Sequence, residues 1–264
     1  MERFRNWRIR TTEWPFPEQP TRSWWQIMSR FALTVVHAYS RFWMTKLNQT
    51  RVINRDILVE HVFNRPKNVP LITVSNHASC MDDPHLWATL PSLQSARWVP
   101  GARELIFTRL VQSIVFGFGR VVPVVRGYGV YQKAMDFTLD RLNEGGWTHI
   151  YPEGKVNESG ELMRLKWGVG RWISDCMIPP IVVPIWHVGM DDVLPNRKPY
   201  IPRMFKRVTI LIEEPLNFVE MLARHRQTQT DALTQRKEIT DVIEATFARM
   251  RQKAIEMHQE WEHN

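Results

Sequence analysis

One short segment of the chain holds an unusual density of residues that could do acid–base chemistry. The segment VSNHASCMDDPHLW, residues 74–87, places His77, Cys80, Asp82 and Asp83 between a short apolar run and the helix-like residues that follow. A carboxylate on one imidazole nitrogen would hold the tautomer of a histidine and stabilise its imidazolium, and the other nitrogen could then accept a proton. The pattern favours His77 as a general base with Asp82 as its partner.

The same segment allows three other interpretations. Cys80 could form an acyl-thioester with His77 as its base, although a reactive thiolate needs an electropositive, partly exposed site that the sequence does not show. The two histidines and two aspartates have the atoms for a metal site, but His85 follows a proline into a predicted helix and is expected to point away. A buried pair of His77 and Asp82 without a chemical role is the third possibility. Five-residue spacing arises often by chance, so other segments must decide.

After residue 48, short runs rich in β-branched residues alternate with helix-like segments. This alternation predicts the strands and helices that position residues 74–87. The fold expected is an α/β domain whose mixed, largely buried sheet is flanked by helices. Asn76 and His77 then follow a strand into a loop at the sheet edge, and Asp83 before Pro84 has the residue types of a helix start. The predicted strands are 57–62, 71–75, 97–99, 121–125, 148–151, 181–186 and 207–212; the predicted helices are 84–93, 101–113, 129–144, 166–176 and a long amphipathic one from about residue 231.

Composition indicates one sizeable core and an acidic partner. A chain of 264 residues is short for two domains, and its two cysteines, Cys80 and Cys176, are expected to be reduced. The formal net charge of +8 calls for nucleic acid or an anionic membrane. Five of the 12 tryptophans fall in the first 43 residues, which suits a membrane–water boundary. No zinc-finger or RNA-binding pattern supports nucleic acid, so we expect membrane phospholipids and no nucleic acid as partners, and no particular oligomeric state.

Two apolar segments are candidates for membrane contact. Residues 1–22 are expected to form a basic arm, and 24–47 predict a helix lying in the interface, with a buried core helix as the alternative. Charged residues interrupt 24–47, so it is not expected to span a bilayer. The second segment, 105–125, predicts either a shallow hairpin in the membrane or a buried helix-to-strand turn. We therefore divide the chain into a membrane-associated part, 1–47, and a catalytic domain, 48–264. The side chains expected to contact the membrane are Trp24, Trp25, Phe31 and Trp43.

Blocks elsewhere in the chain decide between the interpretations of the first segment. NHASCMDDPHLW has the Asn-His-x-x-x-x-Asp form of the glycerolipid acyltransferase superfamily, which the chain resembles. The later blocks follow in the family's order as GRVVPVVRG, YPEGKVN (151–157) and PPIVVPIW (179–186). The resemblance extends from about residue 24 to 255. Tyr151 departs from the Phe more common in the family, and Lys155 from the usual Thr or Ser.

The resemblance implies roles for individual residues. His77 and Asp82 would be catalytic, Asn76 would contact the substrate, and Glu153 with Gly154 would belong to the site for the glycerol phosphate moiety. Arg126 and Lys155 are candidate phosphate contacts by their charge, with a solvated surface position as the alternative. Backbone N–H groups of the turn or the following helix start are candidates to stabilise an oxyanion. The metal-like residues His187, Asp191 and Asp192 are expected to belong to a loop after the last block.

Longer sequence segments such as MDDPHLW, LKWGVGR and PIWHVGMDDVLPN resemble those of a mitochondrial branch of phospholipid–lysophospholipid transacylases. This implies acyl transfer between phospholipids, with cardiolipin remodelled through a monolysocardiolipin acceptor and without coenzyme A as obligatory donor. It also implies peripheral attachment to a mitochondrial membrane facing the intermembrane space. The mechanism needs no metal or other cofactor. The alternatives are a coenzyme-A-dependent lysophosphatidate-type acyltransferase and a catalytically idle scaffold that binds anionic lipid.

Overall fold

A mixed sheet of five strands forms the centre of the fold in this computed structural model, which describes residues 14–17, 23–92 and 97–263. The strand order is β1-β7-β6-β2-β5. Only the β6–β7 pair is antiparallel, so the carboxyl ends of β5, β2 and β6 meet at one edge. The bounds are β1 Gln49–Ile53, β2 Leu71–Ser75, β5 Trp147–Ile150, β6 Ile181–Val188 and β7 Arg207–Ile212. The predicted fold class is confirmed, whereas most of the predicted basic arm at 1–22 lies outside the described residues.

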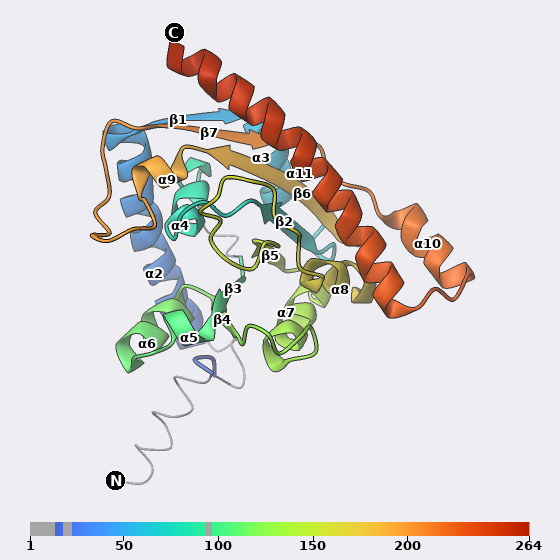
Figure 1. The fold of residues 1–264 in the computed structure, drawn as a ribbon. Helices are drawn as coiled ribbons and strands as arrows, with labels where there is room; N and C mark the ends of the chain where they lie inside the picture. The colour runs from blue at the N-terminus through green and yellow to red at the C-terminus, as the bar shows by residue number, and fades with distance from the viewer. Residues whose placement is uncertain (1–13, 18–22, 93–96, 264) are drawn as a thin grey trace, which may run out of the picture.

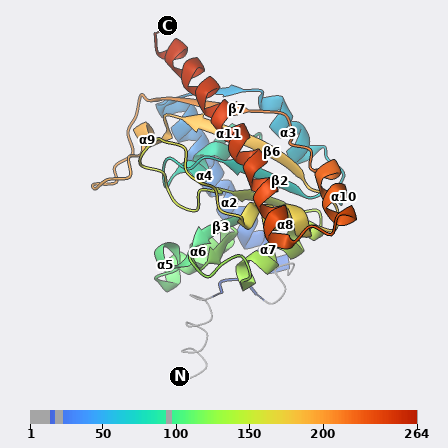
Figure 2. The same ribbon diagram turned by 45° about the vertical axis from the view of Figure 1, so that its right-hand side comes forward.

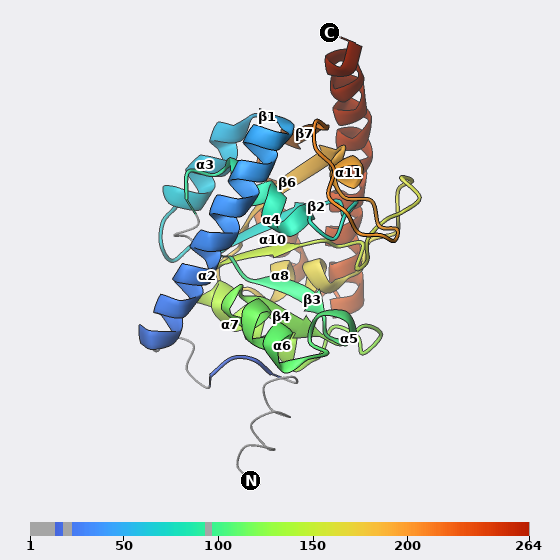
Figure 3. The ribbon, with the colours of Figure 1, turned by 90° about the vertical axis from the view of Figure 1, so that its left-hand side faces the viewer.

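Two layers of helices cover the two faces of the sheet (Figures 1 and 3). On one face, Ile72, Val182 and Leu211 pack against α8 (Gly168–Asp175), α10 (Val219–Gln227) and α11 (Ala232–His263). The opposite face is covered by the π-helical turn η1 (Trp43–Leu47), α3 (Arg55–Phe63), α4 (Asp82–Leu86), the 3₁₀ turn η2 (Trp87–Thr89) and α9 (Met190–Val193). Because both faces are buried, the central strands are apolar on both sides, as expected for parallel strands. Figure 2 shows α11 crossing the sheet obliquely.

A second, smaller sheet lies beside β5. It pairs β3 (Val99–Ala102) with β4 (Val121–Val124) in parallel, and a bridge between Trp98 and Thr148 joins it to the central sheet. The connecting helices are α5 (Arg103–Ile106) and α6 (Leu110–Phe118), and α7 (Lys133–Asn143) follows β4. The segment 105–125 is therefore a short helix leading into a strand.

Helix α2 (Ser23–Phe42) presents one face to the protein and a second, apolar face outward. Trp25 is only 2% exposed and stacks on Trp98 with ring centroids 5.9 Å apart. The prediction that Trp25 contacts the membrane is therefore wrong, because this indole belongs to an aromatic core with Phe16. Trp43 is half-buried and stacks on Tyr39. The exposed apolar residues of α2 are Trp24, Ile27, Met28, Phe31, Val35, Val36, Tyr39 and Phe42. Within the described residues, no helix is long and apolar enough to cross a membrane.

Two of the strand assignments differ from those that the sequence predicts, and the predicted helix 101–113 is divided between β3, α5 and α6. Residues 57–62 were expected to form a strand, but they lie in α3, where Leu58 and Val62 are both buried on one side of the helix. Their spacing of four residues matches the helical period. Strand β1 was not predicted, because its sequence QTRVI is polar at the start and lies at the sheet edge with little burial. The remaining predicted strands overlap the observed ones, and 71–75 and 207–212 coincide with β2 and β7.

Candidate active site

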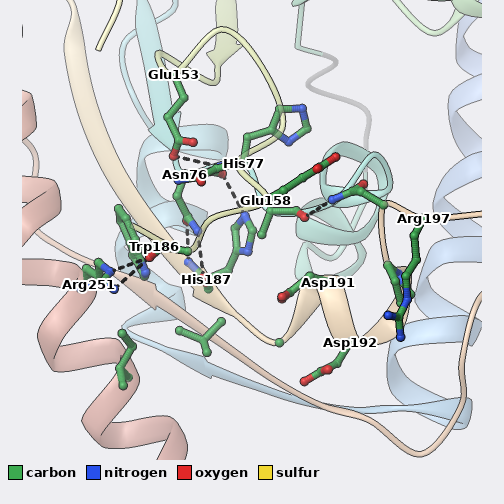
Figure 4. A pocket seen from close by; sticks show the side chains of 18 of the residues that line it. Asn76, His77, Glu153, Glu158, Trp186, His187, Asp191, Asp192, Arg197 and Arg251 are labelled. Atoms are coloured by element: carbon green, nitrogen blue, oxygen red, sulfur yellow. Dashed lines mark hydrogen bonds between the residues drawn. The ribbon is translucent and has the colours of Figure 1, made fainter. Parts of the chain in front are cut away.

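The carboxyl ends of three neighbouring parallel strands bring the candidate residues together, and Figure 4 shows the arrangement. Asn76 and His77 follow β2, Glu153 follows β5 and His187 lies near the end of β6. All four line a cavity of about 470 Å³, a size typical of ligand sites. Substrate sites in open α/β sheets commonly form at this edge. The fold therefore positions His77 beside a space that can hold the polar part of a substrate.

A tight turn from His77 to Asp82 holds the imidazole. Asp82 Oδ2 lies 2.9 Å from His77 Nδ1 and also accepts hydrogen bonds from the backbone N–H groups of Ala78 at 2.7 Å and Ser79 at 2.9 Å. Asp82 is fully buried, whereas the His77 side chain is 19% exposed. A carboxylate on Nδ1 selects the tautomer with hydrogen there, and His77 Nε2 has no hydrogen-bond partner among the described residues. That nitrogen can accept a proton.

The charge on Asp82 is stabilised within the protein. Burial by itself raises the pKa of this carboxyl, but His187 and the hydrogen bond with His77 outweigh burial and lower its pKa below the ordinary value. His187 Nε2 is 3.5 Å from Asp82 Oδ2. An ionised Asp82 can stabilise an imidazolium at His77, which is what a general base requires of its partner.

Asn76 links the two strands that carry the histidines. Its Nδ2 donates to the carbonyl of His187 at 3.0 Å, and the N–H of His187 donates to Asn76 Oδ1 at 2.9 Å. His187 Nε2 lies 2.9 Å from the carbonyl oxygen of Asn76. Both the oxygen and the nitrogen of the Asn76 side-chain amide thus bond to β6, so this residue positions the turn. Its predicted role in substrate contact stays a prediction.

Glu153 holds the other side of the turn. Its Oε1 accepts a hydrogen bond from the N–H of His77 at 3.3 Å, and the carbonyl of His77 accepts one from the N–H of Asn157 at 2.7 Å. The ring of Tyr151 stacks on the His77 ring with centroids 4.0 Å apart. Burial raises the pKa of Glu153 to about 7, so near neutral pH this carboxyl can either donate or accept a hydrogen bond.

The predicted phosphate contacts do not line the cavity. Arg126 is half-exposed and pairs with Glu104 in α5, and Lys155 is exposed on the loop after β5. Gly154 takes a left-handed conformation, φ 73°, which residues with a side chain rarely adopt. The cations that do line the cavity come from later in the chain, namely Arg197, Arg203 and Arg251. No motif in the sequence indicated these three arginines; the only signal for Arg197 and Arg203 was the basic segment PNRKPYIPRMFK after the last family block, and Arg251 had none.

The geometry disfavours the alternatives for the first segment. Burial and the nearby Asp82 raise the pKa of the Cys80 thiol, which opposes a thiolate nucleophile. Burial lowers the pKa of His85 to about 4, and its two ring nitrogens have no partner among the described residues. Asp83 accepts a hydrogen bond from Trp87 and pairs with Arg97, so it does not cap the helix as predicted. In the part of the chain that the structure describes, no group of His, Cys, Asp and Glu side chains could hold a metal ion.

The turn does not supply the oxyanion donors that the sequence suggested. The N–H groups of Ala78 and Ser79 donate to Asp82, that of Cys80 donates to Asn196 and that of Asp82 donates to Ser79. These amides are therefore already satisfied inside the protein. The cations of the cavity wall are the positive groups that line the space beside His77.

The chain shares sequence and fold with known acyltransferases. The family model described as Acyltransferase matches residues 56–188. Tafazzin from Drosophila melanogaster is 41% identical over 254 residues, which cover 94% of this chain and 67% of that protein. N-acylphosphatidylethanolamine synthase from Arabidopsis thaliana is 38% identical over 197 residues, 70% of this chain and 69% of that one.

A solved structure supports the same fold. The crystal structure of the 1-acyl-sn-glycerophosphate acyltransferase PlsC from Thermotoga maritima is similar with a TM-score of 0.57 over 84% of this chain and 81% of that chain. Its 17% identity makes this a likeness of fold alone. The sequence matches, together with an α/β fold of the same kind, show that the chain belongs to the tafazzin family within the glycerolipid acyltransferase superfamily and is an acyltransferase.

Proposed function

We propose that the protein is a transacylase that moves a fatty acyl chain from a phospholipid to a lysophospholipid, with His77 and Asp82 as its catalytic pair. The observation that carries this proposal is the 2.9 Å contact between His77 Nδ1 and the buried Asp82 Oδ2, beside an open cavity. An idle lipid-binding scaffold would have no use for an ionised carboxylate buried against a histidine, because burying a charge is costly.

The mechanism follows from the free nitrogen of His77. Nε2 takes the proton of the acceptor hydroxyl as that oxygen attacks the ester carbonyl carbon of the donor, and a tetrahedral intermediate forms. The bond from the carbonyl carbon to the donor oxygen then breaks, and the imidazolium returns the proton to that departing oxygen. Asp82 stabilises the imidazolium throughout. Donor and product are both oxygen esters of similar energy, so the reaction is expected to run in both directions.

The substrates are proposed to reach the cavity from a membrane. The outward face of α2, with Trp24 and Phe31 exposed, and the exposed residues Val111 and Val115 of the adjacent α6 would lie in the interface. The cavity is large enough for a headgroup and glycerol, so acyl chains would stay in the lipid. Following its family, we assign the protein to a mitochondrial membrane facing the intermembrane space, with residues 1–47 as the membrane-associated part. The proposed acceptor is monolysocardiolipin, whose phosphates suit the cations Arg197, Arg203 and Arg251.

An exchange assay without thioesters tests the proposal. Purified protein is mixed with labelled phosphatidylcholine and either monolysocardiolipin or lysophosphatidylcholine, with coenzyme A and its esters absent. We expect label in the acceptor, more of it in monolysocardiolipin, and return of label when the donor and acceptor roles are exchanged. His77→Ala should abolish transfer while circular dichroism and thermal unfolding stay close to those of the unmodified protein.

Two results would overturn this assignment. Strict dependence on an added acyl-thioester would identify a coenzyme-A-dependent acyltransferase instead. Near-normal transfer by folded His77→Ala protein would exclude the proposed mechanism.

A further inference from the structure

The loop between α9 and β7 has an unusual composition for an exposed segment. Residues 195–206, PNRKPYIPRMFK, which we call the 195–206 loop, carry four cations and no acidic residue. The large apolar side chains of this loop are exposed rather than folded inward. They are Tyr200, Ile201, Met204 and Phe205, and Ile201 is 62% and Phe205 83% exposed. Interleaved cations and exposed apolar side chains are typical of surfaces that bind anionic lipid.

The base of the loop is fixed against the end of the α2 segment. The N–H of Phe205 donates to the carbonyl of Leu47 at 2.7 Å, and the N–H of Lys206 donates to Asn48 Oδ1 at 2.9 Å. In Figure 3, α2 and the 195–206 loop both lie on the side that faces the viewer. The base of the loop therefore lies next to the end of the segment that carries α2, and both elements are on one side of the molecule.

The backbone of Phe205 is held in an unusual conformation at the base of the loop. Phe205 has φ 60°, a left-handed conformation that is an outlier for a bulky residue. A strained residue normally persists because its surroundings favour it, and strain of this kind gathers at functional sites. Here the side chain contributes little to the core because it is almost fully exposed. The hydrogen bonds that join Phe205 to Leu47 and Lys206 to Asn48 hold this conformation, and it presents the ring of Phe205 to the solvent.

The loop is also a wall of the active-site cavity. Asn196, Arg197 and Arg203 line the cavity together with His77, and Figure 4 shows Arg197 at its margin. Ile201 and Phe205 do not line it. A membrane that received the apolar side chains would thus meet the rim of the cavity, and a lipid could enter without leaving the bilayer.

We propose that the 195–206 loop is a second membrane-docking element, which inserts Ile201 and Phe205 into an anionic lipid surface and holds the rim of the cavity against it. The inference rests on the proposed function, because it takes lipid as the substrate. It adds a surface contributed by the C-terminal half of the chain to the contact made by α2.

Vesicle flotation tests the loop with a matched pair of variants. Ile201→Gln combined with Phe205→Asn removes the apolar side chains without adding charge, and asparagine accepts the left-handed conformation. The control, Val219→Gln combined with Leu233→Gln, removes two exposed apolar side chains from α10 and α11, where α10 lies on the other side of the molecule in Figure 1. Vesicles are phosphatidylcholine with and without phosphatidylglycerol. Turnover is measured on dihexanoyl phosphatidylcholine and lysophosphatidylcholine dispersed in detergent, where docking is not needed.

The proposal expects tighter binding to vesicles with phosphatidylglycerol and a partition coefficient about tenfold lower for the loop variant on them. The control variant should bind within about twofold of the unmodified protein, and turnover in detergent should be within about twofold for both. Equal binding by the loop variant, or an equal loss in the control, would overturn the proposal. Loss of detergent turnover in parallel with binding would also overturn it, because the loop would then act through the cavity alone. Flotation does not require turnover, so the two proposals can fail separately. A protein that shows no acyl transfer, but whose binding to vesicles still depends on the loop, would refute the proposed transacylase function and support the docking role.

Discussion

Replacement of Asp82 by asparagine removes one negative charge and keeps the size of the side chain. In the unmodified protein the carboxylate lies 2.9 Å from His77 Nδ1, so the centres of charge would be about 4 Å apart once His77 becomes an imidazolium. Two unit charges at that distance interact by about 4 kcal/mol at an effective dielectric constant near 20. Since about 1.4 kcal/mol corresponds to a factor of ten in rate, Asp82→Asn should lower turnover roughly 10³-fold.

The variant also has a structural cost that must be measured separately. Asp82 Oδ1 is buried and has no partner among the described residues, so an asparagine that keeps its oxygen on the three donors would leave its amide N–H groups unpaired. An unsatisfied buried donor costs about 1–3 kcal/mol. Urea unfolding should therefore show a loss of this size, which leaves most molecules folded.

Asp83→Asn is the matched control on the same turn. Asp83 pairs with Arg97, whose side chain is nearly buried, and does not contact His77. This variant should lose stability but keep its turnover per folded molecule within a few fold, about the scatter of such measurements. The exchange assay is run on both variants with the folded fraction determined in each. Turnover of Asp82→Asn within about tenfold of the unmodified protein, or an equal loss in Asp83→Asn, would refute the electrostatic argument.

Two further predictions concern the other titratable groups of the site. Cys80→Ser should keep acyl transfer within about twofold, because the raised pKa of the Cys80 thiol leaves little thiolate; a complete loss in the exchange assay would point to a thioester intermediate. Glu153→Gln should stabilise the protein above pH 7 by about 1–3 kcal/mol. The pKa of Glu153 is raised from 4.5 to about 7, so the folded state retains a proton that the unfolded chain loses, and the stability of the unmodified protein falls as pH rises between these values. In thermal unfolding, the difference in stability between the two proteins should stay constant below pH 4.5 and grow as the pH rises to 7. A difference that does not change with pH would contradict the raised pKa of Glu153.

The turn that joins His77 to Asp82 could be predicted from sequence because its determinants are local. A strand that ends before Asn76, and an aspartate five residues after His77, leave a tight turn as a simple way to bring the carboxylate to the ring. The contribution of Glu153 followed from its place after a second strand. The order of the strands in the sheet, which puts β5, β2 and β6 side by side, was not available from the sequence.

The wall of the cavity could not be predicted either, because it too depends on how elements that are distant in the sequence pack together. Arg126 follows β4, which belongs to the smaller sheet, and its position therefore depends on how that sheet docks beside β5. Arg251 lies on α11 near the middle of a helix whose periodicity indicates only packing on the core. Its approach to the cavity, where it donates to the carbonyl of Gly160, depends on the crossing of α11 over the sheet. Long-range placement of this kind leaves no pattern in a single sequence.

The turn of the site depends on local sequence and the cavity wall on long-range packing, and this difference suggests separate roles for the two parts. One oxygen of Asp82 accepts hydrogen bonds from His77 and from two backbone N–H groups, so these contacts tie the turn at three points and leave Asp82 Oδ2 no position for a substrate group. Selection among lipids must then come from groups outside the turn. The groups that we propose for this role include Arg197 and Arg203 on the 195–206 loop and Arg251 on α11, which line the cavity from the C-terminal part of the chain. On the proposed mechanism, changes in that wall are therefore expected to alter the acceptor while the acid–base chemistry proposed for His77 and Asp82 stays the same.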